Sequence, residues 1–225
     1  MAFQKTLFAV LFSIFYTTLS AQYNTLSEWY VGPSAGATAS TITLVPNPKM
    51  VDILYSLGKT GGISTRYISE EHFGFQIDFN YFESGWKEYI KGSGQTYNYS
   101  RQLNFVEVPF LMHAYTSAGS TRYFLNIGPK FCYLLSEKEE ILDNSNDIPQ
   151  HGKLVESPFQ YGILGGAGFE VHLRRSVIGL EGRYCYTLSN IFDDTIDSDN
   201  FATSSLQTVS LNLYYYFQIG GYNKK

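Results

Sequence analysis

Four histidines are the side chains of this 225-residue chain that are best suited to acid–base chemistry near neutral pH. The surrounding pattern predicts His72 in a short turn, His113 and His172 inside strands, and His151 in a long loop. The sequence has no His-Glu-x-x-His or Cys-x-x-Cys motif, so it predicts neither a helical zinc site nor a redox pair. Only His151, with serines and aspartates of the long loops, could form a catalytic group. We therefore expect no enzymatic activity, no cofactor and no metal site.

Seven charged side chains are unusual because they stand within otherwise apolar runs, where they alternate with large apolar residues. This arrangement has two interpretations. The charges could line a path for protons or ions, or they could form ion pairs that fix how the runs fit together. They are three bases and four acids, namely Arg66, Lys130, Arg183, Asp78, Glu107, Glu170 and Glu181.

Two loops carry further candidate binding groups. Residues 193–199 are acidic enough to bind calcium, but they lack the central Gly and the final Glu of an EF-hand loop, so we expect a solvated loop. Residues 83–99 combine Trp86 and Tyr99 with further tyrosines and two lysines, a composition typical of adaptable binding surfaces. Loops on a rigid scaffold often carry function, but this composition identifies no particular partner.

The elements that must position these residues are eight strand-like runs, separated by gaps that alternate between long and short. Eight strands joined in this way form an antiparallel meander with tight turns at one end and long loops at the other. Outer-membrane barrels have this asymmetry, with short periplasmic turns and longer extracellular loops. The long gaps are about 39–57, 83–99, 136–156 and 189–205, and the short gaps are about 69–72, 116–121 and 174–176.

Period-2 alternation gives most of these runs one apolar face and one polar or small-residue face. In the run 73–82, for example, Phe73, Phe75 and Phe79 alternate with polar residues such as Gln76. A soluble barrel would enclose the apolar face, but the interior of eight strands is only just wide enough for side chains to fill. Roughly four or five large apolar residues per strand exceed that volume, so we expect the apolar face to contact lipid. The sequence therefore predicts an all-β, eight-stranded antiparallel up-and-down transmembrane β-barrel.

The seven charged residues face the lumen in this arrangement, and they nearly balance. An eight-stranded barrel has no room for both these side chains and a water column, which favours buried ion pairs over an ion path. Cys132 and Cys185 also face the lumen, on the fifth and seventh strands. Because strands lie ~4.8 Å apart, the two Cα atoms should be ~10 Å apart, which is too far for a disulfide. We expect two free thiols packed inside the barrel.

The N-terminal segment has the pattern of a secretory signal peptide. Lys5 supplies the positive charge, residues 6–16 form the apolar stretch, and Leu19-Ser20-Ala21 is a small-residue cleavage site. This stretch is shorter than the ~20 residues of a spanning helix. We expect cleavage after residues 1–21 and one barrel domain over 22–225. Cleavage removes one Lys and no acid, which takes the formal net charge from -4 to -5 and argues against a nucleic-acid partner.

Four segments match short family patterns: 105–111 (Phe-Val-Glu-Val-Pro-Phe-Leu), 126–129 (Asn-Ile-Gly-Pro), 165–170 (Gly-Gly-Ala-Gly-Phe-Glu) and 183–191 (Arg-Tyr-Cys-Tyr-Thr-Leu-Ser-Asn-Ile). They resemble the PorT-like group of small outer-membrane β-barrel proteins, within the wider OmpA/OmpX-like family. Thr187 stands where the pattern of that group has Gly. The resemblance implies an integral outer-membrane protein with no established enzymatic activity, and one member of the group is linked to protein secretion. It transfers no active-site residue to this chain.

These observations favour a non-enzymatic outer-membrane barrel with a structural or binding role, acting through its extracellular loops or in support of protein secretion. Its expected partners are outer-membrane lipid, the barrel assembly machinery, and an extracellular or secretion-system protein. The alternatives are a narrow channel and, less favoured, an enzyme that acts on lipid or peptide at the barrel rim. Export through the cleaved signal peptide would place the barrel in the cell outer membrane.

Overall fold

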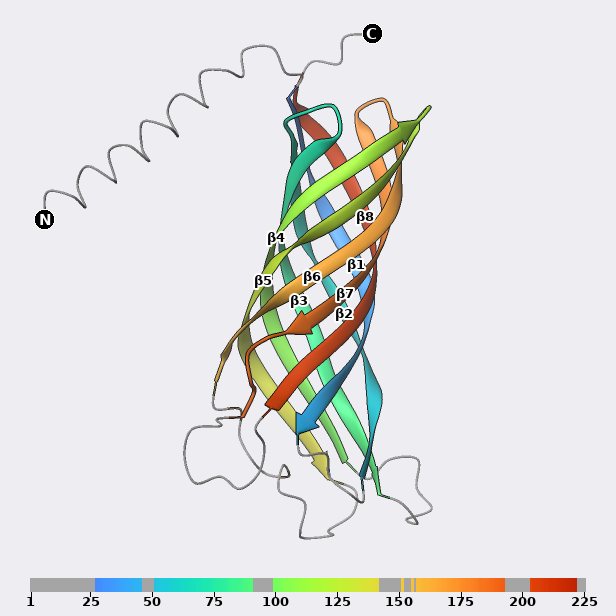
Figure 1. Ribbon diagram of the computed structural model, residues 1–225. Helices are drawn as coiled ribbons and strands as arrows, with labels where there is room; N and C mark the ends of the chain where they lie inside the picture. The colour runs from blue at the N-terminus through green and yellow to red at the C-terminus, as the bar shows by residue number, and fades with distance from the viewer. Residues whose placement is uncertain are drawn as a thin grey trace, which may run out of the picture.

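The computed structural model describes residues 27–45, 51–90, 99–141, 151, 155, 157–192 and 203–221, which form eight strands around one axis (Figure 1). The expected signal peptide, residues 1–21, lies outside the described residues. No helix in the described part of the chain is long and apolar enough to span a membrane. The strands are β1 (Glu28–Val45), β2 (Val51–Ile68), β3 (Phe73–Ile90), β4 (Tyr99–Ala118), β5 (Thr121–Ile141), β6 (Phe159–Leu173), β7 (Ser176–Thr187) and β8 (Thr203–Gly220).

The strands form a closed barrel in which each strand pairs antiparallel with its neighbours in the sequence. Closure is made by β1 and β8, which pair from Trp29↔Gly220 to Val45↔Thr203. The prediction of an all-β, eight-stranded antiparallel up-and-down barrel is confirmed. The connections 69–72, 119–120 and 174–175 lie at the end where β1 begins and β8 finishes (Figure 1). We call this the short-turn end, and the opposite end the long-loop end.

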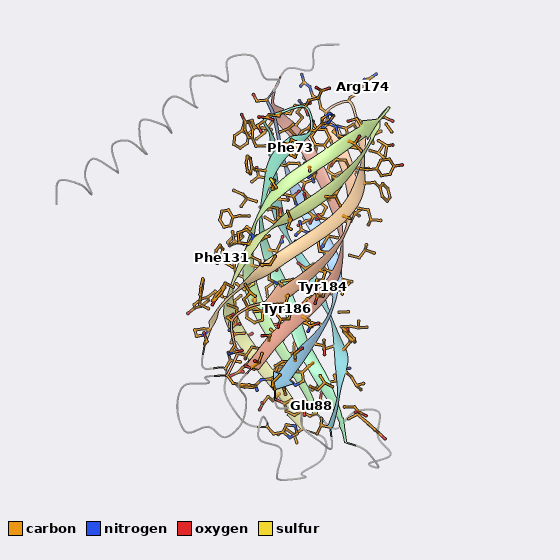
Figure 2. All side chains as sticks on the ribbon, in the orientation of Figure 1. Phe73, Glu88, Phe131, Arg174, Tyr184 and Tyr186 are labelled. Atoms are coloured by element: carbon orange, nitrogen blue, oxygen red, sulfur yellow. The ribbon has the colours of Figure 1, made fainter. Side chains whose placement is uncertain are left out.

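The apolar face of the strands is the outer face of the barrel. On β3, Phe75 and Phe79 are 58% and 60% exposed, whereas Gln76 between them is fully buried in the lumen. Figure 2 shows Phe73 and Phe131 pointing away from the barrel axis. These exposures confirm the expectation that the large apolar residues of the alternating runs face outward and the polar residues between them face inward. Such an outer surface suits lipid and not water.

The strands extend further toward the long-loop end than the alternation predicted. On β3, β4 and β5 the added stretches have polar outward residues, such as Lys87, Gln102 and Lys138, although the backbone pairing continues. The alternation of apolar residues marks only the part of a strand that contacts lipid, so it stops before the strand does. The gaps expected at 39–57, 83–99, 136–156 and 189–205 are instead the connections 46–50, 91–98, 142–158 and 188–202.

Candidate functional site

The lumen contains a polar network that includes all seven charged residues expected there. None of the seven is more than 4% exposed, and each of the three bases contacts at least one of the four acids. Such pairs require excellent geometry, because taking charges out of water is costly unless their partners satisfy them. The pairs are Arg66–Glu170, Lys130–Glu107, Arg183–Asp78 and Arg183–Glu181.

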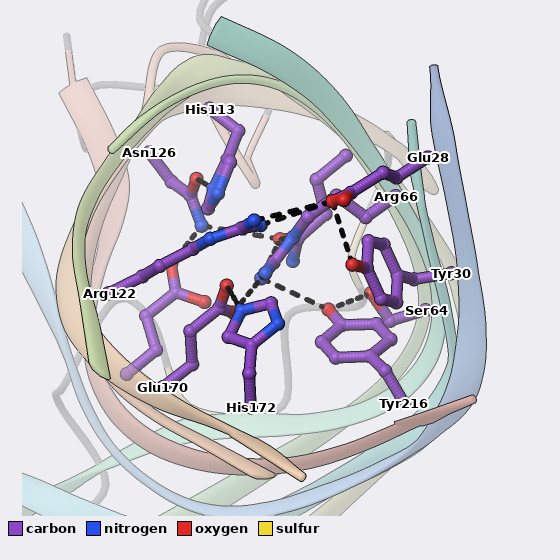
Figure 3. Close-up of polar contacts among 12 residues, drawn as sticks. Glu28, Tyr30, Ser64, Arg66, His113, Arg122, Asn126, Glu170, His172 and Tyr216 are labelled. Carbon is purple, nitrogen blue, oxygen red and sulfur yellow. Dashed lines mark hydrogen bonds and ion pairs between the residues drawn. The ribbon is translucent and has the colours of Figure 1, made fainter. Parts of the chain in front are cut away.

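Arg66 organises the network toward the short-turn end (Figure 3). Its guanidinium forms an ion pair with Glu170, and its Nε and Nη2 atoms donate to Oε1 of Gln76 at 3.0 and 2.8 Å. The same guanidinium lies over the ring of Tyr216, 4.6 Å from the ring centroid. The Tyr216 hydroxyl in turn is 2.7 Å from the hydroxyl of Ser64. Arg66 therefore joins β2, β3, β6 and β8 across the lumen.

Arg183 is the second centre of the network. Its Nη2 is 2.7 Å from Oδ2 of Asp78, and its Nε is 3.0 Å from Oε1 of Glu181. Glu181 also accepts a hydrogen bond from Nδ2 of Asn126 at 2.8 Å. His113, a histidine expected inside a strand, lies with Nδ1 2.8 Å from Oδ1 of Asn126. This histidine is therefore a member of the buried network, held by an amide.

Lys130 lies nearer the middle of the barrel. Its Nζ is 3.0 Å from Oε2 of Glu107 and 4.4 Å from the ring centroid of Phe82. A cavity of about 10 Å³ beside this pair has room for roughly one water molecule. Side chains thus fill the lumen here, as the small diameter of an eight-stranded barrel requires.

The segment Gly32–Gly36 (Gly-Pro-Ser-Ala-Gly) has the Gly-x-Ser-x-Gly spacing of a nucleophile elbow, a similarity that sequence reasoning missed. A nucleophile elbow needs a sharp turn between a strand and a helix. Here the segment lies within β1, and the hydroxyl of Ser34 donates to Oδ1 of Asn80 at 3.1 Å. The spacing therefore does not create a serine nucleophile.

Cys132 and Cys185 are free and buried, which confirms the expectation of two unpaired thiols inside the barrel. We expect neither thiol to react with a maleimide while the barrel is folded in detergent, because the reagent cannot reach the lumen. Both should react after the barrel is unfolded by heat in denaturant. Mass spectrometry would count the adducts. Rapid modification of either thiol in the folded barrel would contradict the packed lumen.

An apolar cluster, which we call the lumenal plug, fills the lumen toward the long-loop end. Sequence reasoning missed it, because lumen-facing positions were expected to be small or polar. The one available signal was the fourth strand-like run, 103–115, whose two faces are both apolar. The buried members of the plug are Ile42, Leu44, Phe82, Trp86, Tyr99, Leu103, Phe105, Cys132, Ile191, Phe192 and Leu206.

Trp86 and Tyr99 belong to the plug, so the expectation that they form an exposed binding loop within 83–99 was wrong. Both side chains are fully buried. Trp86 Nε1 donates to Oε1 of Glu88 at 2.7 Å, and the Tyr99 hydroxyl donates to Oε1 of Glu139 at 2.6 Å. In this stretch the outward residues are polar and the inward residues are aromatic. The resulting mixture of residue types resembles the composition of a loop, although the backbone is a strand.

A second ionic layer covers the plug at the long-loop end, where Figure 2 places Glu88. Arg101 lies with Nη2 2.7 Å from Oε2 of Glu137 and Nη1 3.1 Å from Oε1 of Glu139. His151 lies with Nε2 3.0 Å from Oε2 of Glu88. His151, the histidine that the sequence left as the catalytic candidate, therefore contacts the buried carboxylate of Glu88 at the end of the barrel.

The long-loop end is asymmetric, because β6 begins at Phe159 and β7 finishes at Thr187 while β3, β4 and β5 continue past them (Figure 1). β5 pairs with β6 only as far as Tyr133↔Phe159 and then continues to Ile141. Among the described residues, 136–141 pair with β4 alone, after a bulge at Leu135. We call this stretch the β5 edge.

The segment 188–192 fills part of the space beyond the short strand β7. The hydroxyl oxygen of Ser204 accepts hydrogen bonds from the backbone N–H groups of Ile191 and Phe192, at 3.1 and 3.0 Å. The backbone N–H of Ser204 donates to Oδ1 of Asn190 at 2.9 Å. These contacts fold the segment into the lumen, where Ile191 and Phe192 complete the plug.

The remaining candidate groups do not converge on a reaction centre. His172 Nε2 lies 2.9 Å from Oε1 of Glu170, and the ring of His72 packs against Tyr115. Within the described ranges, no group of three or more His, Cys, Asp or Glu side chains could hold a metal ion. The acidic loop 193–199 lies outside the described residues.

Comparison with known proteins places the fold in context. Residues 20–193 match the model of a family described as an outer membrane protein beta-barrel domain. No curated protein matches the chain significantly. The outer membrane protein OprG of Pseudomonas aeruginosa has a similar structure, with a TM-score of 0.53 and 12% sequence identity over 89% of this chain and 99% of OprG.

Two further solved structures are more distant. Neisserial surface protein A has a TM-score of 0.44 and 12% identity over 85% of this chain and 97% of its own. Ail, the attachment invasion locus protein of Yersinia pestis, has a TM-score of 0.42 and 13% identity over 84% of this chain and 99% of its own. At 12% identity the likeness to OprG extends to the fold alone.

Proposed function

Because this chain belongs to the outer membrane protein beta-barrel domain family, we propose that it is a non-enzymatic binding barrel of the cell outer membrane. Residues 1–21 are its cleaved signal peptide. In such barrels the long loops are extracellular and the short turns periplasmic, so the long-loop end projects from the cell. There the barrel holds an extended segment of a partner, either an extracellular protein or a component of a secretion assembly. The PorT-like resemblance supports the second kind of partner.

The β5 edge is the observation that carries this proposal. Within the described residues this edge is paired on one side only, and an extended peptide binds an edge of that kind by adding a strand to its N–H and C=O groups. Side chains at alternate positions then select the partner. The outward-facing residues Ser136, Lys138 and Glu140 offer a hydroxyl, a positive charge and a negative charge. A partner strand with an acid opposite Lys138 and a base opposite Glu140 would be preferred.

The filled lumen supports binding over the two alternatives. A channel needs a continuous water path, but the ion pairs and the lumenal plug occupy the axis of the barrel. A rim enzyme needs a nucleophilic serine, threonine or cysteine beside its base, and among the described residues the side chains that His151 contacts are those of Glu88 and Tyr99. Steady single-channel conductance in a planar bilayer would favour the channel instead.

Photo-crosslinking from the β5 edge tests the proposal. A photoreactive amino acid in place of Lys138 should give a discrete protein adduct in intact cells, which mass spectrometry can identify. With the photoreactive amino acid placed at Ser136 instead, the corresponding adduct should disappear when the charges of the edge are exchanged by Lys138→Glu with Glu140→Lys. That double variant keeps the net charge, and both side chains are exposed, so the barrel should fold normally.

The matched control is the surface ion pair of Lys59 and Glu83, whose Nζ and Oε1 atoms are 3.7 Å apart on β2 and β3. Exchanging these two charges should leave the adduct at position 138 unchanged. Absence of any adduct at 138, or equal adducts from position 59, would refute binding at the β5 edge.

A further inference from the structure

A pocket of about 270 Å³ opens at the short-turn end of the lumen, opposite the end used in the proposed function. We propose that this mouth pocket binds the carboxylate or phosphate group of a small water-soluble ligand. Its volume is near the lower limit of small-molecule pockets. The residues that line it come from β1, β4, β5, β6 and β8 and from the two turns that follow β4 and β6. They are Glu28, Tyr30, Ser117, Gly119, Arg122, His172, Arg174 and Gln218.

The charges around the mouth pocket favour an anion. Among the lining side chains, Arg122 and Arg174 carry positive formal charges and Glu28 a negative one, so the arginines outnumber the acid. Beneath the pocket, one oxygen of Glu170 contacts His172, and the other is paired with Arg66. The acid below the pocket is therefore already compensated, and it does not cancel the two arginines.

Arg122 is the central group of the mouth pocket, and its pairing with Glu28 is loose. Figure 3 shows its guanidinium extending across the lumen toward that carboxylate. The Nη1 and Nη2 atoms lie 3.3 and 3.4 Å from Oε2 of Glu28, beyond the 2.7–2.9 Å of a strong charge-assisted hydrogen bond. Glu28 Oε2 also accepts a hydrogen bond from Tyr30 at 2.8 Å. A ligand oxyanion could therefore bind Arg122 more closely than Glu28 does.

Arg174 gives independent support, because its backbone is in an unfavourable conformation. It has a φ of 53° in the two-residue turn between β6 and β7, and no other described residue except glycine has a positive φ. Such turns normally place Gly or Asn at this position. A backbone outlier of this kind is more common at ligand sites, where the side chain has a use. At position 174 that use is a second guanidinium beside the pocket.

The chemistry of the pocket wall favours a polar ligand over a lipid. A planar guanidinium binds carboxylate or phosphate through two parallel hydrogen bonds. Ser117, Tyr30 and Gln218 add hydroxyl and amide groups for further polar contacts. The pocket opens inside the barrel mouth and not on the lipid-facing wall, so a soluble anion reaches it more readily than a lipid headgroup does.

Titration of the folded barrel in zwitterionic nanodiscs tests the inference. The probes are inorganic phosphate and acetate at constant ionic strength, with glycerol as the uncharged control. NMR signals of the arginine Nε–H groups should shift saturably for Arg122 and Arg174. Arg122→Gln should weaken binding at least about tenfold, because it removes a charge-assisted contact. Glu28→Gln should strengthen binding by roughly three- to tenfold, because it removes the competing carboxylate.

Two variants of the turn separate binding from folding. Arg174→Gly should weaken binding while the melting temperature stays the same or rises, because Gly adopts a positive φ without strain. Arg175→Gln is the matched control, because this neighbouring arginine does not line the pocket, and it should leave binding unchanged. Nanodiscs that contain phosphatidylglycerol identify a lipid source, since they would shift the Arg122 signal before any probe is added.

Three results would overturn the inference. One is the absence of a saturable shift with either phosphate or acetate. Another is weaker binding in Glu28→Gln, which would mean that Glu28 holds Arg122 for structural reasons only. The third is an Arg122 shift that appears only with phosphatidylglycerol, because the occupant would then be a lipid headgroup.

Discussion

Arg183→Ala should lower the free energy of unfolding of the barrel by about 3–5 kcal/mol, because it leaves Asp78 and Glu181 in the lumen without the base that both contact. Neither carboxylate has any measurable exposure to water. The variant also removes the contact of the guanidinium with the ring of Tyr214, whose centroid is 5.4 Å from Cζ. Urea unfolding in detergent micelles, followed by gel migration of folded and unfolded forms, would measure the change.

Two further variants test whether the loss of stability comes from the two unpaired carboxylates. Arg175→Ala removes an arginine from an exposed turn and should change stability by about 0.5 kcal/mol or less. Adding Asp78→Asn and Glu181→Gln to Arg183→Ala should restore part of the lost stability, because neutral amides tolerate a site without a base. Unchanged stability in Arg183→Ala would remove the case for a structural network, and the ion-path interpretation would then regain support.

The barrel could be predicted from the sequence because lipid imposes one simple rule on every strand. Phe75, Phe79 and the outward residues of the other strands must be apolar, so their period of two marks the strands and assigns both faces. The same rule placed Arg66 and Arg183 on the inner face. The partners of these arginines could not be predicted, because Glu170 and Asp78 lie 104 and 105 residues away in the sequence. Those contacts depend on how the strands are staggered around the barrel.

The long-loop end was the least predictable part, because the rule fails once a strand leaves the lipid. Outward residues such as Lys138 become polar there, while inward residues such as Leu103 are free to become apolar. The contrast between the two faces is thereby reversed. A pattern of alternating hydrophobicity cannot distinguish this reversal from the end of the strand. The β5 edge and the lumenal plug, on which the proposed function depends, both lie in that stretch.

Replacing Trp86 is therefore the sharpest test of whether this stretch is an exposed loop or part of the lumenal plug. As a residue of an exposed loop it should tolerate replacement within about 0.5 kcal/mol, whereas as a buried member of the plug it should not. We expect Trp86→Ala to destabilise the barrel by about 3–5 kcal/mol, because it leaves a cavity and exposes the buried carboxylate that its Nε1 contacts. Trp86→Phe should retain much of the packing and lose mainly the hydrogen bond to Glu88.

Tyr89→Ala is the matched control, because Tyr89 is an aromatic residue of the same strand on the opposite face, where it is half-buried. Its loss should change the free energy of unfolding much less than that of Trp86. Equal and small changes in the free energy of unfolding at both positions, measured by the same urea unfolding, would mean that the Trp86 side chain is exposed. In that case the long-loop end would lack a packed interior, and the β5 edge would have no rigid support from which to bind a partner strand.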